Sequence, residues 1–105
     1  MISIPVLSVV GLNIEEHKKD FIKKLMLDVM NNKDLVVTTS ILPDPINPFD
    51  SNAIKVQINN FDVGFIGKND QYYFDFTKYN YTANIVSWGI VKDGSTYVYI
   101  QPCVI

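Results

Sequence analysis

The chain has 105 residues, of which 48% are hydrophobic and 19% charged, and its formal charge is −2. This length and composition suit one folded domain, residues 1–105, and exclude a disordered segment or a coiled coil. All nine basic residues are lysines, so a broad arginine-rich face is excluded and any contact with nucleic acid must be local.

The first half of the chain predicts a strand, a helix and a second strand. The β-branched run Ile4–Val10 indicates the first strand. Asn13 followed by Glu16 has the spacing of a capping box, and apolar residues then recur every three or four positions, so we expect a helix over residues 14–31. Leu35–Leu42 is rich in valine and threonine and predicts the second strand.

The middle of the chain predicts a β-hairpin and a short helix. Ile54–Ile58 alternates apolar and polar residues, as a strand with one buried face does. Asn59 and Asn60 tolerate a positive φ and should form a tight turn into a partner strand over residues 61–67. The aromatic segment Asn69–Thr77 is expected to be a short helix.

The end of the chain predicts a second hairpin. Its strands are expected at Tyr81–Val91 and Thr96–Gln101, with the turn around Asp93 and Gly94. The order of all these elements is mostly antiparallel. It predicts a mainly β fold, a small OB-like or SH3-like barrel with two helices in a single α+β domain.

A proline-braced turn precedes the strand at residues 54–58. Pro48 excludes the helical region for Asn47, and the short side chains of Asp50 and Asn52 can bond back to nearby amides. The turn should therefore be rigid and display Phe49 and Asp50 at its tip. The alternative is a purely structural turn, in which Phe49 packs into the core and Asp50 only caps amides.

The same residues resemble a known family. The run Asp44–Val56 (DPINPFDSNAIKV), followed by Val63–Ile66 (VGFI), is similar to the signature of the HIRAN domain, and Val9–Gly11 matches the end of that family's first strand. The resemblance covers essentially the whole chain. It implies a compact barrel related to the oligonucleotide-binding fold, found alone in bacteria and phages or attached to DNA translocases and nucleases. We therefore expect a non-catalytic module that binds single-stranded DNA 3′ ends at stalled forks or in DNA repair, acting with a helicase or nuclease partner.

Position by position, the resemblance also implies a set of DNA-binding residues. Asn47, Phe49 and Asp50 match the family's end-binding pocket. The Phe49 ring can stack on the last base, a contact worth about 1–3 kcal/mol. Asp50 can accept a hydrogen bond from a 3′-hydroxyl and repel a phosphate at the same place. Asn52 and Lys55 complete the predicted set.

The chain departs from the DNA-binding members of the family after the first strand. Those members carry an arginine and two aromatic residues there, whereas this chain has Asn13, Ile14 and Glu15. Glu15 has the wrong sign for a phosphate contact, and Lys18 or Lys68 is a candidate replacement, as Lys55 is. This departure supports an alternative function, a protein-interaction or assembly module that keeps the barrel and has lost DNA binding.

The remaining conspicuous residues are predicted to be structural. The aromatic residues Tyr72, Tyr73, Phe74 and Phe76 suit either a stacking platform or a helix packed on the barrel, and we expect them to pack in the core. Trp88 and Tyr97 are expected to form a cross-strand pair rather than a base platform, and Cys103 to have a packing role. His17 has no second ligand nearby in the sequence, so no metal is expected. No nucleophile can be paired with a base, so we expect neither an enzyme nor a cofactor. Without a membrane span or a signal peptide, a cytoplasmic protein with no membrane partner is expected.

Overall fold

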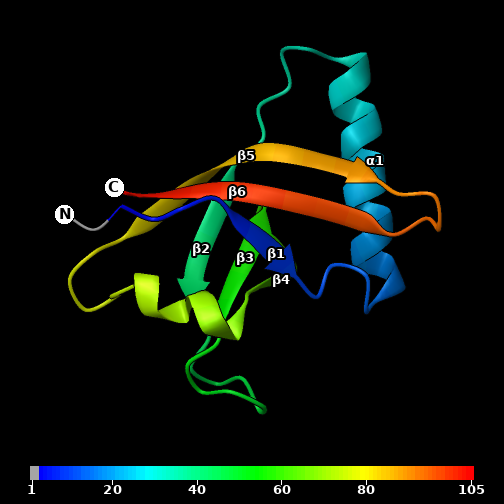
Figure 1. Cartoon of the computed structure of the whole chain (residues 1–105). Helices are drawn as coiled ribbons and strands as arrows, with labels where there is room; N and C mark the ends of the chain where they lie inside the picture. Colours follow the sequence, from blue (N-terminus) through cyan, green and yellow to red (C-terminus); the bar gives the residue numbers. More distant parts are fainter. Residues whose placement is uncertain (1–2) are drawn as a thin grey trace.

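A computed structural model describes residues 3–105 of the chain. Six antiparallel strands close into a barrel in the order β1-β4-β3-β2-β5-β6, with β6 pairing back onto β1 (Figure 1). The elements are β1 (Leu7–Val10), α1 (Glu16–Asn31), β2 (Thr39–Pro43), β3 (Ile54–Ile58), β4 (Phe61–Ile66), the 3-10 helix η1 (Lys68–Tyr73), β5 (Tyr81–Ile90) and β6 (Thr96–Val104). The predicted fold class, a mainly β barrel with two helices, is confirmed.

The core of the barrel is formed by the side chains that point inward from the strands. In β3 every second residue is buried, because successive side chains of a strand point to opposite faces. α1 adds one buried stripe and contacts β4 and β6. The largest completely buried side chains are Ile22, Ile41, Ile58, Ile100, Val56, Val63 and Val98. Gly64 allows β1 and β4 to approach closely, since a Cβ there would collide with the carbonyl oxygen of Val10.

The predicted capping box is wrong. α1 begins at Glu16, and Glu15 occupies the N-cap position without a side-chain cap. The Asn13 side chain is bonded to β6 instead: its Nδ2 donates to the Thr96 carbonyl at 2.8 Å, and its Oδ1 accepts from the Thr96 amide at 2.7 Å and hydroxyl at 3.0 Å. A carboxamide has both a donor and an acceptor, so it pairs with a backbone as another strand would. This long-range pairing replaces the local cap.

The second strand is shorter than predicted. β2 begins at Thr39 rather than at Leu35. Asn59, in the turn after β3, bonds to Thr38, the residue before β2. Its backbone amide donates to the Thr38 carbonyl at 2.9 Å, and its Oδ1 accepts from the Thr38 amide at 2.9 Å. These two bonds fix the point at which β2 starts to pair with β3. Asn59 and Asn60 have φ angles of 51° and 67°, which confirms the predicted tight turn.

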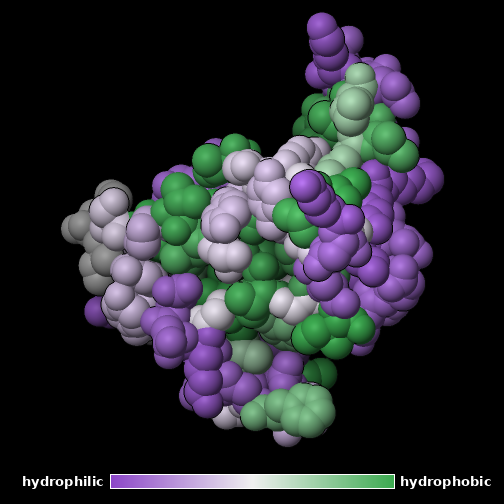
Figure 2. Space-filling model, turned by 45° about the vertical axis from the view of Figure 1, so that its right-hand side comes forward, coloured by the Kyte–Doolittle hydropathy of each residue, from purple (hydrophilic) through white to green (hydrophobic). Residues whose placement is uncertain are grey.

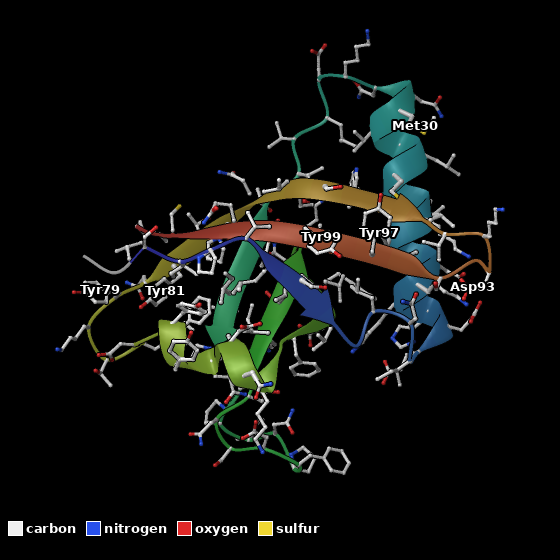
Figure 3. The ribbon with its side chains drawn as sticks, in the orientation of Figure 1. Met30, Tyr79, Tyr81, Asp93, Tyr97 and Tyr99 are labelled. Carbon is white, nitrogen blue, oxygen red and sulfur yellow. The ribbon has the colours of Figure 1, made fainter. Side chains whose placement is uncertain are left out.

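The register of the last hairpin differs from the prediction. Trp88 lies opposite Val98, and Tyr97 lies opposite Gly89, so Trp88 and Tyr97 are not a cross-strand pair. A bulge between Ile85 and Ser87 shifts the register in this part of the hairpin. Tyr97 instead covers Gly89, whose added Cβ would lie 2.5 Å from the Tyr97 hydroxyl. Figure 3 shows Tyr97 and Tyr99 on β6.

Two further expectations about single residues need correction. Cys103 is exposed on the outer face of β6, so it has no packing role. Of the aromatic residues in segment 72–76, Tyr73, Phe74 and Phe76 pack against the core as expected. Tyr72 does not, because 73% of its surface is exposed. Within residues 3–105, no helix is both long and apolar enough to cross a membrane.

Candidate functional site

The loop between β2 and β3 forms the candidate site and extends below the barrel (Figure 1). Its two ends are joined, since the Asp44 amide donates to the Ala53 carbonyl at 2.8 Å. Inside the loop the Asn47 amide donates to the Asp44 carbonyl at 3.1 Å, and the Ala53 amide donates to the Asp50 carbonyl at 3.1 Å. These backbone hydrogen bonds make the proline-braced segment an ordered turn. Figure 2 shows pale green, hydrophobic atoms beside purple, hydrophilic ones at the bottom of the molecule, at the height of this loop.

Asn47 holds the tip of this turn together. Its Oδ1 accepts hydrogen bonds from the amides of Phe49 at 2.9 Å and Asp50 at 3.2 Å, and its Nδ2 donates to Asp44 Oδ2 at 3.2 Å. These are the short-range side-chain bonds expected of asparagine in a turn. Asn47 therefore positions its two neighbours.

Phe49 points into the solvent. Its side chain is 95% exposed, so the alternative in which it packs into the core is wrong. Burying a phenylalanine stabilises a fold by about 1.5–3 kcal/mol relative to leaving it exposed. This turn forgoes that stabilisation, and the ring is free to contact a ligand.

Asp50 joins the loop to η1. Its Oδ2 accepts from Gln71 Nε2 at 3.0 Å, and its Oδ1 accepts from the Asn52 amide at 2.9 Å. The pKa of the Asp50 carboxyl lies below its ordinary value. The largest cause is the hydrogen bond from Gln71, followed by the bond from the Asn52 amide and the positive charge of Lys68. Asp50 is therefore a carboxylate at neutral pH and is fixed in direction.

A pocket of about 250 Å³, the Asp50 pocket, lies beside these residues. Its lining includes Asn47, Phe49, Asp50, Phe65, Lys68 and Gln71. Among residues 3–105, the ion pairs do not include Lys68, so its ammonium group is available to a ligand. The pocket thus combines an exposed aromatic ring, a carboxylate and an ammonium group.

The structure brings together three of the five predicted site residues. Asn47, Phe49 and Asp50 line the Asp50 pocket, whereas Asn52 lines a neighbouring pocket. Lys55 points outward from β3, with its Nζ 3.9 Å from the Asp62 carboxylate.

Phe65, Lys68 and Gln71 also line the Asp50 pocket but were not in the predicted set. The strand alternation of the VGFI motif would have placed Phe65 outward, and Lys68 was already a candidate phosphate partner. Gln71 gives no local signal, because its contact with Asp50 arises only when η1 folds against the loop.

The segment after β1 forms a different environment. Ile14 is 85% exposed, and the Glu15 carboxylate lies 3.4 Å from the Nζ of Lys18. That same Nζ lies 5.9 Å from the centroid of the Phe65 ring. Lys18 is thus paired with a carboxylate and lies over one face of Phe65, so that face of the ring is covered and the ammonium group already has an acidic partner.

No family model matches the chain, and neither the curated proteins nor the solved structures searched give a match. The HIRAN resemblance therefore stays a prediction that rests on the motif residues. Among residues 3–105, no group of three or more His, Cys, Asp or Glu side chains is arranged to hold a metal ion.

Proposed function

We propose that this protein is a non-catalytic cytoplasmic module that binds the 3′ end of single-stranded DNA and serves a helicase or nuclease in DNA repair. One observation carries the proposal. The exposed ring of Phe49 lies beside the ionised carboxylate of Asp50, at a pocket that also contains Lys68.

Each of these groups has a distinct task in end binding. The Phe49 ring stacks on the last base. Asp50 accepts a hydrogen bond from the terminal 3′-hydroxyl, because each carboxylate oxygen has two lone pairs and uses one of them within the protein. A 3′-phosphate in the same place is repelled by the carboxylate. Lys68 attracts the last phosphate between nucleotides.

Fluorescence anisotropy with two oligonucleotides, one ending in a 3′-hydroxyl and one in a 3′-phosphate, tests the proposal. The wild-type protein should bind the hydroxyl end more tightly. Equal binding of both ends, or no binding, would contradict the proposed function. Phe49→Ala should weaken binding of the hydroxyl end by about tenfold or more, since one stacked base is lost.

Asp50→Asn isolates the role of the carboxylate. This variant should lose preference for the hydroxyl end more than it loses affinity for that end. Asp93→Asn is the matched control, because Asp93 is an exposed aspartate that also accepts bonds from its own turn, here from the Ser95 amide at 2.9 Å. Asp93 lies in the β5–β6 turn, away from the β2–β3 loop (Figure 3). Its replacement should leave end preference unchanged.

The alternative function, an assembly module, is supported by an apolar groove between α1 and β5. This groove of about 300 Å³ is lined by Met26, Leu27, Met30, Trp88 and Ile90, among others. Leu27 and Met30 are 58% and 77% exposed. Figure 2 shows green, hydrophobic residues just below the purple, hydrophilic upper tip of the molecule. A second copy of the chain is the partner to test. A stable dimer in light scattering that Leu27→Glu dissociates, together with absent oligonucleotide binding, would favour this alternative.

A further inference from the structure

Two more pockets continue from the Asp50 pocket along η1. The middle pocket, of about 490 Å³, shares Ala53, Lys68 and Gln71 with the Asp50 pocket. The Tyr79 pocket, of about 420 Å³, shares Tyr72 and Phe74 with the middle pocket. Because each pocket shares wall residues with the next, the three adjoin one another along η1, and this row of pockets is here called the η1 groove. It begins at the carboxylate of Asp50 and ends beside Tyr79.

Tyr72 provides an open aromatic face in the middle of the η1 groove. Its ring is stacked on the ring of Tyr73, with centroids 4.2 Å apart and planes inclined by 29°. Tyr73 packs against the core, so it supports one face of Tyr72 from behind. With 73% of its surface exposed, Tyr72 has its other face available. A supported ring with one free face is the arrangement on which single-stranded bases stack.

The far end of the groove contains a second pair of tyrosines. The rings of Tyr79 and Tyr81 lie 6.2 Å apart in an edge-to-face arrangement, and both appear beside η1 in Figure 3. Tyr81 is anchored, because it is buried and its hydroxyl accepts a hydrogen bond from the Asp75 amide at 2.8 Å. Tyr79 is 45% exposed, so an aromatic surface remains open to a second base.

The charges along the η1 groove are mixed. Lys68 lies at its start and Lys78 at its end, and the ion pairs among residues 3–105 include neither of them. Asp50 and Asp75 are the carboxylates that line it, and Asp75 accepts a hydrogen bond from the Thr77 amide at 3.1 Å. Two cations near two aromatic platforms suit a phosphate backbone, while the carboxylates keep the net electrostatic attraction small.

The opposite route out of the Asp50 pocket is less suitable for a strand. It passes over Phe65, whose ring lies under the Lys18 ammonium group at 5.9 Å. Glu15 lies next to that ammonium group and repels phosphates. The open aromatic face is therefore on the η1 side.

We propose that the η1 groove holds the nucleotides that precede the bound 3′ end, with one base stacked on Tyr72 and the next lying against Tyr79. This inference rests on the proposed function, because the groove begins where the terminal nucleotide is held. The ligand is a continuous single strand, read by stacking and not by base sequence.

Two ligands, a single nucleotide with a 5′-phosphate and a 3′-hydroxyl and a strand of about eight nucleotides, separate the groove from the Asp50 pocket in an anisotropy titration. Both carry a 3′-hydroxyl, so both can occupy the Asp50 pocket, but only the longer ligand reaches Tyr72. Tyr72→Ala should weaken binding of the longer strand by about tenfold and leave binding of the single nucleotide unchanged. Tyr99→Ala is the matched control, since Tyr99 is 42% exposed on β6 and does not line the groove.

The outcomes distinguish this inference from the proposed function. If Tyr72→Ala leaves binding of the longer strand unchanged, or weakens binding of both ligands equally, the nucleotides do not follow the η1 groove. A retained preference for the 3′-hydroxyl in that case shows that end binding at the Asp50 pocket still stands. If wild-type protein binds neither ligand, both proposals fail. A far-ultraviolet circular dichroism melt of Tyr72→Ala should match that of Tyr99→Ala, since both side chains are exposed. A lowered melting temperature in Tyr72→Ala alone would assign Tyr72 a structural role and overturn the groove.

Discussion

In the β2–β3 loop, short polar side chains satisfy backbone amides and thereby hold two other side chains in the solvent. Asn47 bonds the amides of Phe49 and Asp50, and Asp50 in turn bonds the amide of Asn52. A loop built this way loses little entropy when a ligand binds, because its geometry exists before the ligand arrives. Gln71 adds a bond from outside the loop, at 3.0 Å to Asp50.

The Gln71 bond leads to a prediction about pH. Gln71→Ala should raise the pKa of Asp50 toward its ordinary value, because the largest cause of the lowered pKa is removed. A carboxyl with a depressed pKa in the folded state contributes stability above its unfolded-state pKa and loses it as the pH falls through the folded-state value. Between the folded-state and unfolded-state pKa values of Asp50, the variant should therefore lose less stability on acidification than the wild-type protein does.

An NMR titration of the carboxyl carbons measures this change directly. The Asp50 midpoint should lie below the ordinary value in the wild-type protein and move upward in Gln71→Ala. Asp93 is an internal control, because its pKa is lowered by Ser95, which the substitution does not touch. An Asp50 midpoint that stays in place would show that Gln71 does not hold the carboxylate.

Among the elements, the Asn13–Thr96 pairing connects the segment that precedes α1 to the start of β6. Asn13→Ala should lower the free energy of unfolding by about 1–3 kcal/mol, since the buried amide and hydroxyl of Thr96 lose their partner. Urea denaturation measures this difference. Asn84→Ala, at an exposed position of β5, is the control and should change stability by less than about 0.5 kcal/mol. Equal effects of the two substitutions would contradict the pairing.

A helix, strand or turn can be predicted from the sequence when the residues that determine it are neighbours along the chain. The turn at Asn59 and Asn60 is predictable, because positive φ is a property of those residues. The start of α1 and the register at Trp88 are not, since Thr96 and a bulge in β5 decide them. Thr96 is far from Asn13 along the chain, and the bulge is defined only by how β5 pairs with β6, so no short window of sequence contains these determinants.

The same rule applies to the candidate site. The Asn47–Asp50 turn follows from proline and asparagine chemistry within a few residues, and the structure shows it as an ordered turn. The role of Gln71 could not be predicted, and the sequence did not show which ring of segment 72–76 keeps an open face, because both depend on how η1 folds against the barrel. The turn that would hold the strand end is local in sequence, whereas the part that would hold the preceding nucleotides is tertiary.

For the whole molecule, a net charge of −2 and nine lysines limit how binding can be driven. Two lysines, Lys68 and Lys78, line the η1 groove. Each phosphate neutralised on a single strand contributes about −0.7 to the slope of log K against log salt. The proposed binding mode therefore relies on stacking more than on charge, which is the reverse of a general nucleic-acid binder.

This balance predicts a shallow salt dependence. The anisotropy titration repeated over a range of salt concentrations should give a slope of about −1.4 for two phosphate contacts, and Lys68→Ala should reduce its magnitude by about 0.7. Lys33→Ala is the control, because Lys33 is exposed beyond the end of α1 and lines none of the three pockets. A slope steeper than about −3 would require more phosphate contacts than the groove has lysines, and would place the strand on another surface. Association that strengthens with salt would instead indicate burial of apolar surface, as the assembly alternative requires.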